Sequence, residues 1–77
     1  MNFTYSNQAE DFLDKQPSKK SFRIEKAINA LPAGDVKKLK GIRNGYRLRI
    51  GNIRVLFEKD DNSIHVIKID NRGDVYK

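Results

Sequence analysis

Seven basic side chains lie in one short stretch of this sequence that holds no Asp or Glu. They are Lys37, Lys38, Lys40, Arg43, Arg47, Arg49 and Arg54. Residues 1–36 carry five basic and five acidic side chains, whereas residues 37–77 carry eleven and five, so the formal net charge of +6 arises in the second part of the chain. A basic surface of this kind fits nucleic acid, an acidic protein or a membrane surface, and charge alone does not distinguish among them.

Three of these arginines are predicted to share one face of a β-hairpin. Residues 46–57 predict two short strands, in which apolar and basic side chains alternate, on either side of a Gly-Asn loop. A two-residue loop with glycine first favours a type II′ turn, which fixes the pairing of the strands. The predicted pairs are Ile50 with Ile53, Arg49 with Arg54, and Leu48 with Val55. Arg47 and Arg49 on one strand and Arg54 on the next therefore project from the same side of the sheet.

The crowding of the three arginines predicts an anionic ligand. Like charges directly opposite one another in a sheet destabilise it by about 0.2 to 1 kcal/mol per pair. A chain of 77 residues has little stability to lose, since domains of this size bury only about 60% of the surface that the unfolded chain exposes. Such violations of local rules occur at functional sites. Because a guanidinium group donates two parallel hydrogen bonds and stays charged, the predicted ligand is a phosphodiester.

The first part of the chain predicts a strand followed by two helices. Residues 2–5 alternate as in a short strand, and Ser6 is placed to cap the first helix. Pro17 ends this helix, and Ser18 is placed to cap the second. The expected core-facing residues are Ala9, Phe12 and Leu13 in the first helix and Ile24, Ala27, Ile28 and Leu31 in the second. Turn-forming residues 31–35 then end the helical part of the chain.

The second part predicts a three-stranded meander. A turn at residues 60–63, centred on Asp61-Asn62, joins the second and third strands. The predicted pairs across this turn are Phe57 with Val66, Leu56 with Ile67, and Arg54 with Ile69. Residues 70–73 break the pattern before a short last strand at Val75 and Tyr76.

Three further placements follow from these patterns. Tyr46 alternates with the arginines and therefore belongs on the core face of the sheet. His65 lies opposite Glu58, and the two are expected to form a structural pair, not a catalytic one. The three lysines within residues 37–40 lie on an irregular segment, where they form a solvated surface or follow a nucleic-acid backbone.

The composition predicts one compact soluble domain of residues 1–77. The chain is 38% hydrophobic and 34% charged, as globular proteins are. No stretch approaches the roughly 20 consecutive apolar residues that span a bilayer, and the first residues show no export signal, so a cytoplasmic protein without membrane contact is expected. Because the chain has no cysteine and a single histidine, neither a metal nor another cofactor is expected.

Four motifs in this order resemble the RelE/ParE toxins. They are Lys38-Leu39-Lys40-Gly41, Tyr46-Arg47-Leu48-Arg49-Ile50-Gly51, Ile53-Arg54-Val55-Leu56-Phe57 and Asn71-Arg72-Gly73-Asp74-Val75-Tyr76. The resemblance covers the full length and is concentrated in the second part of the chain. It implies a small α+β toxin of a bacterial or archaeal toxin-antitoxin pair, with an N-terminal strand and a helical hairpin packed on a curved antiparallel sheet.

The resemblance also implies roles for five residues. RelE-like members cut messenger RNA in the ribosomal decoding site, whereas ParE-like members poison DNA gyrase and lack the basic catalytic set. By position, Arg47 and Arg49 match the two basic strand residues of the RelE-like nucleases, Arg54 and Arg72 match their phosphate-stabilising arginines, and Tyr76 matches their carboxy-terminal tyrosine. The best-known members have lysines at the two strand positions, one of which serves as general base. Arginine loses its proton only above a pKa of about 12 and is a poor base near neutrality. Surrounding cations are expected to lower the pKa of a tyrosine, which makes Tyr76 the candidate base, or a platform on which an RNA base stacks.

The resemblance therefore implies a metal-independent, ribosome-dependent mRNA endonuclease that inhibits translation. Its expected partners are messenger RNA, the ribosome, and a cognate antitoxin whose acidic or amphipathic helical segment covers the basic face. The expected RNA-binding residues are Lys37, Lys38, Lys40 and Arg43. Two alternatives stay open: a ParE-like inhibitor of DNA gyrase, and a non-catalytic basic module that binds nucleic acid.

Overall fold

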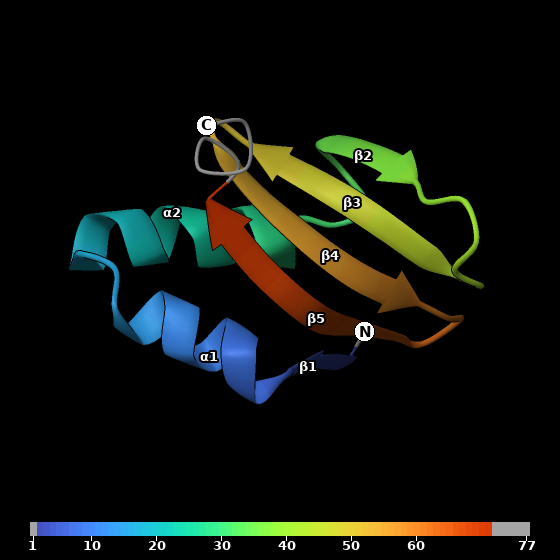
Figure 1. Ribbon diagram of the computed structural model, residues 1–77, viewed down its shortest axis with the longest axis horizontal. Coiled ribbons are helices and arrows are strands. Elements are labelled where there is room, and N and C mark those ends of the chain that lie inside the picture. The colour runs from blue at the N-terminus through green and yellow to red at the C-terminus, as the bar shows by residue number, and fades with distance from the viewer. Residues whose placement is uncertain (1, 72–77) are drawn as a thin grey trace.

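The computed structural model describes residues 2–71 and places two helices and five strands in that range (Figure 1). In chain order they are β1 (Asn2–Tyr5), α1 (Asn7–Asp14), α2 (Ser18–Asn29), β2 (Asp35–Lys38), β3 (Gly45–Ile50), β4 (Ile53–Lys59) and β5 (Ser63–Asn71). The N-terminal strand, the two helices and the meander are present, so the predicted α+β class is confirmed. The predicted last strand at Val75 and Tyr76 lies outside the described residues.

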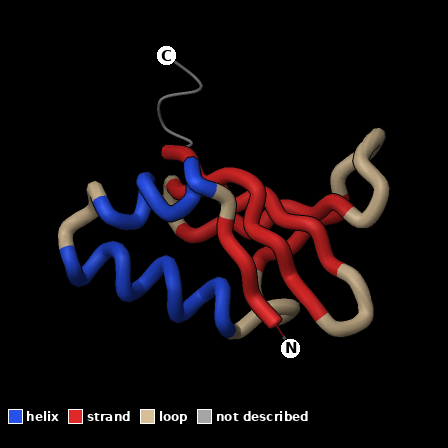
Figure 2. The backbone as a smooth tube through the Cα atoms, turned by 90° about the horizontal axis from the view of Figure 1, so that it is seen from below, coloured by secondary structure: helices blue, strands red, loops and turns tan. Residues whose placement is uncertain are grey.

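The five strands form one sheet in the order β1-β5-β4-β3-β2. The meander of β3, β4 and β5 is antiparallel, as predicted, and β2 extends it antiparallel to β3. At the other edge β1 lies parallel to β5, so the sheet is mixed and not wholly antiparallel. Both helices lie on one side of the strands (Figure 2).

The core lies between the helices and the side of the sheet that faces them. It consists of Ala9, Leu13, Ile24, Ile28, Leu31, Leu48, Ile53, Val55, Phe57, Ile64, Val66 and Ile69. The helical members recur at the predicted helical spacing, and the β3 and β4 members alternate as strand side chains do. Phe12 and Ala27, which were predicted to face the core, are half-buried and pack against it. Full burial of a large aliphatic or aromatic side chain stabilises by about 1.5 to 3 kcal/mol, so this layer holds the three strands of the meander in place.

The two helices begin in different ways. Ser6 caps α1, and its hydroxyl oxygen accepts a hydrogen bond from the backbone N–H of Ala9 at 3.1 Å, as predicted. The prediction that Ser18 caps α2 is wrong, because Ser18 is already the first helical residue and Pro17 occupies the cap position without a side-chain hydrogen bond. Proline restricts φ to about −65°, and Pro17 enters the helix with a φ of −56° and an extended ψ of 149°.

The pairing of β4 with β5 contains a β-bulge that was not predicted. Phe57 pairs with Val66, as expected, but the register shifts between Leu56 and Phe57. The predicted pairs Leu56–Ile67 and Arg54–Ile69 are therefore wrong, and the observed pairs are Leu56–Lys68 and Arg54–Asp70. Strict alternation after Val66 would have turned Lys68 toward the core. With the extra residue of the bulge, Ile69 takes that place and is fully buried.

Polar side chains at the start of α1 support β5 beside this bulge. The hydroxyl of Ser6 donates a hydrogen bond to the carbonyl oxygen of Ile67 at 2.6 Å. The side-chain amide of Gln8 donates from Nε2 to the carbonyl oxygen of Ile69 at 2.7 Å and accepts at Oε1 from the N–H of Ile69 at 2.9 Å. Gln8 therefore takes the place of a neighbouring strand beyond the end of β1. Strand β5 continues through residues 70 and 71, where a break was predicted.

Replacing Gln8 by alanine is expected to lower the free energy of unfolding by about 1 to 3 kcal/mol, because both backbone polar groups of Ile69 lose their partner. Gln8→Glu keeps an acceptor but loses the amide donor, so a smaller loss is expected at pH 7. Urea denaturation followed by circular dichroism measures both changes. An unchanged urea midpoint in Gln8→Ala would contradict this supporting role.

Candidate nucleic-acid interface

Arg47, Arg49 and Arg54 lie on the face of the sheet that points away from the helices. The pairing of β3 with β4 agrees with the prediction and places Arg49 directly opposite Arg54. In the turn between them, Gly51 has a φ of 59°, a conformation that glycine adopts without strain. Side chains alternate along a strand, and Leu48, which stands between two of the arginines, is buried in the core. The prediction of one shared arginine face is therefore confirmed.

Arg54 is held by a carboxylate from the neighbouring strand. Its Nη2 lies 3.1 Å from Oδ2 of Asp70, and its Nε lies 3.3 Å from Oδ1 of the same side chain. The side chains of Arg54 and Asp70 are 28% and 21% exposed, so the pair is largely shielded from water. Paired hydrogen bonds of this kind fix the plane of the guanidinium. They also relieve part of the repulsion between Arg54 and Arg49 inside the protein, so the crowding of these two arginines does not by itself require an anionic ligand.

A second carboxylate, that of Asp35, stands near the other two arginines. Asp35 lies on β2 opposite Arg49. Its carboxylate oxygens are 3.9 Å from Nη2 of Arg47 and 3.9 Å from Nε of Arg49, and its side chain is 59% exposed. Because the distances exceed those of hydrogen bonds and the acid is exposed, each pair contributes at most about 1 kcal/mol. Asp35 therefore reduces the charge of the arginine face without fixing the two guanidinium groups.

Arg47 gives the strongest indication of a ligand. Its side chain is only 13% exposed. Its Nη1 atom is buried and has no hydrogen-bond partner among residues 2–71. A buried donor without a partner costs about 1 to 3 kcal/mol, and more when the group is charged. An anionic oxygen that drew this guanidinium toward the surface would supply the missing acceptor.

The lysines beside the arginines lie partly on a strand. Lys37 and Lys38 belong to β2, so the prediction of an irregular segment is wrong for both. The strand escaped prediction because Val36 is its only apolar residue. Lys37 lies opposite Arg47 and so shares the arginine face, whereas Lys38 points to the other face.

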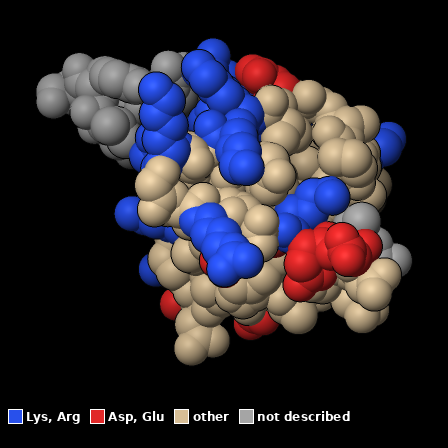
Figure 3. Space-filling view, turned by 90° about the vertical axis from the view of Figure 1, so that its right-hand side faces the viewer, with Lys and Arg blue, Asp and Glu red and all other residues tan. Residues whose placement is uncertain are grey.

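The basic surface continues around the connection between β2 and β3. Lys40 and Arg43 are exposed there, beside Ile42, whose side chain is also exposed. Figure 3 looks onto this end of the molecule and shows several Lys and Arg side chains across it, with acidic side chains at its right and around its edges. The four predicted RNA-binding residues Lys37, Lys38, Lys40 and Arg43 therefore occupy one end of the protein, next to the arginine face.

Two other predicted placements are confirmed. Tyr46 packs against the core, and its ring stacks on Phe57 with a centroid distance of 5.6 Å and an interplanar angle of 19°. His65 lies opposite Glu58 in the sheet. Its Nδ1 atom shares a hydrogen bond of 2.6 Å with the hydroxyl of Thr4 on β1, which ties two strands together.

The remaining candidates, Arg72 and Tyr76, lie outside the described residues. Within residues 2–71, no group of histidine and acidic side chains is placed to hold a metal ion. None of the helices in that range is long and apolar enough to cross a membrane.

Sequence reasoning missed the two acids that stand beside the arginines, Asp35 and Asp70. Both are distant in sequence from the residues they contact and come from the strands on either side of the hairpin. A signal for Asp70 was present, because strict alternation along β5 would have turned Lys68 toward the core. Inserting one bulge residue there would have placed Asp70 opposite Arg54.

The sequence matches no protein-family model and no curated protein. Several solved structures, however, are similar to nearly the whole chain. The RelB-RelE antitoxin-toxin complex from Methanococcus jannaschii contains a chain that is 25% identical, with a TM-score of 0.68 over 95% of this chain and 94% of that one.

The archaeal RelE-RelB complex from Pyrococcus horikoshii OT3 is likewise 25% identical, with a TM-score of 0.77 over 94% of each chain. The YoeB dimer from Staphylococcus aureus is 22% identical, with a TM-score of 0.71 over 88% of this chain and 92% of that one. The chain therefore has the fold of the RelE-like toxins, and the resemblance found in its sequence is confirmed.

Proposed function

We propose that this chain is the toxin of a toxin-antitoxin pair and that it inhibits translation by cutting messenger RNA on the ribosome without a metal ion. Residues 1–77 then form a single toxin domain that acts in the cytoplasm and is neutralised by a cognate antitoxin. The similar structures from Methanococcus jannaschii and Pyrococcus horikoshii are complexes with RelB, which supports a protein partner of this kind.

The observation that carries the proposal is the burial of Arg47 without a full set of hydrogen-bond partners among the described residues. Its side chain is largely buried, one of its nitrogens has no hydrogen-bond partner in the described part of the chain, and Arg49 and Arg54 project from the same face. Phosphate groups satisfy several guanidinium donors at once, which neutral ligands do not. A chain of phosphodiesters therefore matches this face better than an uncharged ligand.

The chemistry of metal-free RNA cleavage assigns a task to each basic residue. The 2′-hydroxyl attacks the adjacent phosphate, so the reaction needs a proton acceptor, cations that stabilise the added charge, and an acid for the leaving oxygen. Arg54 and Arg72 are the proposed stabilisers of this charge, and Arg47 and Arg49 hold the phosphodiester in position. Tyr76 is the proposed proton acceptor or stacking platform, from its match to the carboxy-terminal tyrosine of the RelE-like nucleases.

The basic residues outside this set act through the RNA backbone. Lys37, Lys38, Lys40 and Arg43 are exposed and lie at one end of the molecule. Contacts of this kind add affinity without reading sequence, and they weaken steeply as salt is raised. They are therefore proposed to orient the toxin on RNA of the ribosome or on the messenger itself.

Mapping of transcript ends after induction of the protein in a bacterial host tests this function. The expected result is new 5′ ends within translated regions, which disappear when initiation of translation is blocked. Intact transcripts with stalled replication would show a gyrase inhibitor in place of a nuclease. Intact transcripts with unchanged replication, together with RNA binding in vitro, would show a non-catalytic module.

Asp35→Asn is expected to strengthen the binding of single-stranded RNA by about two- to fivefold at low salt, because one carboxylate near Arg47 and Arg49 is removed. Fluorescence anisotropy with a labelled RNA at two salt concentrations measures the change. Asp61→Asn removes the same charge from the exposed β4–β5 turn and is expected to have a smaller effect. Equal gains in both variants would show that only net charge matters.

A further inference from the structure

A groove runs between α1 and α2. Two adjoining hollows of about 320 and 300 Å³ form it, and both are lined by Leu13, Asp14, Ser21 and Glu25. Tyr5 and Glu10 also line the first hollow, and Phe22 lines the second. This α1–α2 groove therefore combines carboxylates with apolar side chains.

The acids of the groove are not neutralised by neighbouring cations. Glu10, Asp14 and Glu25 are exposed, and every ion pair within residues 2–71 instead involves an arginine of the sheet. Burial and the nearby carboxylate of Glu25 raise the pKa of Tyr5, so its phenol stays neutral beside them. In a chain with a formal net charge of +6, the groove is a local region of negative charge.

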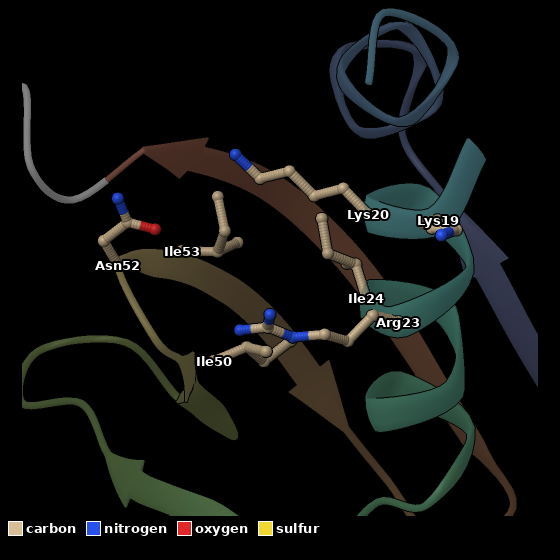
Figure 4. A pocket seen from close by; sticks show the side chains of 7 residues that line it. All are labelled: Lys19, Lys20, Arg23, Ile24, Ile50, Asn52 and Ile53. Carbon is tan, nitrogen blue, oxygen red and sulfur yellow. The ribbon is translucent and has the colours of Figure 1, made fainter. Parts of the chain in front are cut away.

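The other side of α2 is basic. A separate hollow of about 440 Å³ lies between α2 and the β3–β4 turn, and Figure 4 shows Lys20 and Arg23 extending from the helix toward that turn. The two sides of this one helix therefore differ in charge. Because carboxylates repel phosphate groups, the α1–α2 groove does not suit nucleic acid and suits a cationic protein surface.

Two exposed apolar side chains lie at opposite ends of the molecule. Within residues 2–71 the exposed large hydrophobic residues are Phe22, Ile42 and Ile67. Phe22 lines the groove near the α1–α2 loop, whereas Ile42 lies on the β2–β3 connection, residues 39–44. Figure 1 shows the α1–α2 loop at the left and the β2–β3 connection at the right. A chain thus cannot place Ile42 in its own groove.

The β2–β3 connection holds Ile42 in a defined position. The N–H of Gly45 donates a hydrogen bond to the carbonyl oxygen of Ile42 at 3.2 Å, and the N–H of Leu39 donates to that of Gly45 at 3.0 Å. A Cβ atom added at Gly45 would stand only 2.6 Å from Cγ2 of Ile42, so the loop closes this tightly only over glycine. The connection therefore presents Ile42 between two exposed cations, Lys40 and Arg43.

The groove and the β2–β3 connection are complementary. One offers carboxylates around an apolar surface that includes Phe22, and the other offers an aliphatic side chain between cations. An apolar centre with a polar rim is the usual composition of a contact between proteins. Opposite charges on the two surfaces also favour this pairing over others. Every copy of the chain carries both surfaces.

We propose that the β2–β3 connection of one copy of this chain docks into the α1–α2 groove of a second copy. Ile42 enters the groove beside Phe22, and the cations on either side of it pair with the carboxylates of the groove. Because the two surfaces differ, the contact is head to tail. It leaves a free groove and a free connection, so it extends beyond a dimer unless a ring closes.

The contact has one consequence that rests on the proposed function. It covers Lys40 and Arg43, so copies that are associated lose RNA contacts proposed above. The groove residues themselves lie on the helices and have no assigned part in RNA binding. Asp14→Asn combined with Glu25→Gln is therefore expected to keep transcript cleavage within about twofold of wild type. The experiments below contain neither RNA nor ribosomes, so a failure of the nuclease assignment leaves their result unaffected.

Sedimentation velocity on the full chain tests the proposal. Two copies with a net charge of +6 repel each other at a distance. The measurement therefore uses about 0.1 M NaCl, at which charges more than about 10 Å apart are largely screened. The chain is expected to be monomeric at about 5 µM and to form dimers and larger species at about 200 µM, as small transient contacts do. A monomer at both concentrations would overturn the proposal.

Two double variants supply the sharpest comparison. Asp14→Asn with Glu25→Gln neutralises the groove, and Lys40→Gln with Arg43→Gln neutralises the connection. Each double variant alone is expected to associate about tenfold more weakly than wild type, because two charge pairs are lost. An equimolar mixture of the two holds one intact groove and one intact connection per pair of molecules. It is expected to form a 1:1 dimer and nothing larger.

A control variant removes acidic charge elsewhere. Asp11→Asn with Asp61→Asn changes two exposed acids outside the groove and is expected to leave association within about twofold of wild type. A mixture of the two test variants that associates no more tightly than either alone would overturn the proposal, as would equal weakening by the control. So would a monomeric wild type whose Phe22 ring signals shift with polylysine, because the groove would then take a basic partner of another kind.

Discussion

Replacing Arg54 by alanine is expected to slow transcript cleavage by about a hundredfold to a thousandfold, the usual effect of removing one preorganised donor from a developing negative charge. Arg54 suits this role because Asp70 already holds its guanidinium through two hydrogen bonds. A donor that is fixed before the reaction needs little reorganisation when the phosphate gains charge. Primer extension on a translated message, with purified ribosomes and toxin, measures the rate.

Further variants separate charge from geometry and supply a control. Arg54→Lys keeps the charge but loses the paired hydrogen bonds with Asp70, so an intermediate rate is expected. Lys26→Ala removes an exposed cation from α2 and is expected to leave the rate within twofold. Arg72→Ala is expected to match Arg54→Ala. Wild-type cleavage by a folded double variant of Arg54 and Arg72 would contradict the assignment.

The interpretation of Arg54→Ala requires a measurement of folding. Without Arg54, Asp70 loses a partner in a largely shielded place, which is expected to cost about 1 to 3 kcal/mol of stability. Thermal unfolding is therefore measured on the same sample. A slow variant that still unfolds cooperatively, well above the assay temperature, has lost a catalytic contribution and not its structure.

The part of the site that sequence predicts well is local. The pairing of Arg49 with Arg54 depends on a two-residue turn and on alternation over a few residues on each side. Both signals lie within a dozen residues of one another. The same holds for the cap of α1 by Ser6, which depends on residues within one helical turn. Short-range geometry therefore sufficed to place the three arginines on one face.

The part that sequence predicts poorly depends on contacts between distant segments. Asp70 meets Arg54 only because a bulge shifts β5 by one residue, and Gln8 bonds the backbone of that strand from α1. Asp35 meets Arg49 only because a short edge strand with one apolar residue joins the sheet. Only the contact of Asp70 left a signal in the sequence, namely the alternation that would have turned Lys68 toward the core; the contacts of Gln8 and Asp35 left none. The charge balance of the site was therefore mispredicted although its geometry was not.

Replacing Phe57 by alanine is expected to lower the free energy of unfolding by about 3 to 5 kcal/mol. Phe57 is 1% exposed and stacks on Tyr46 of the adjacent strand. It also pairs with Val66 at the start of the bulge, so its loss opens a cavity where three strands meet. Native proteins of this length are stable by about 4 to 12 kcal/mol, and the variant is expected to be largely unfolded or close to it at 37 °C. Urea denaturation measures the change.

An exposed phenylalanine, Phe22, supplies the matched control for Phe57→Ala. Phe22 on α2 is 67% exposed, and Phe22→Ala is expected to change the free energy of unfolding by less than about 0.5 kcal/mol. Phe57→Ala is also expected to abolish growth arrest, because β4 carries Arg54 on its other face and loses its alignment with β3. Arg54→Ala reaches the same phenotype with the fold retained. If Phe57→Ala kept both its urea midpoint and its toxicity, the packed strands would not be what positions the arginines.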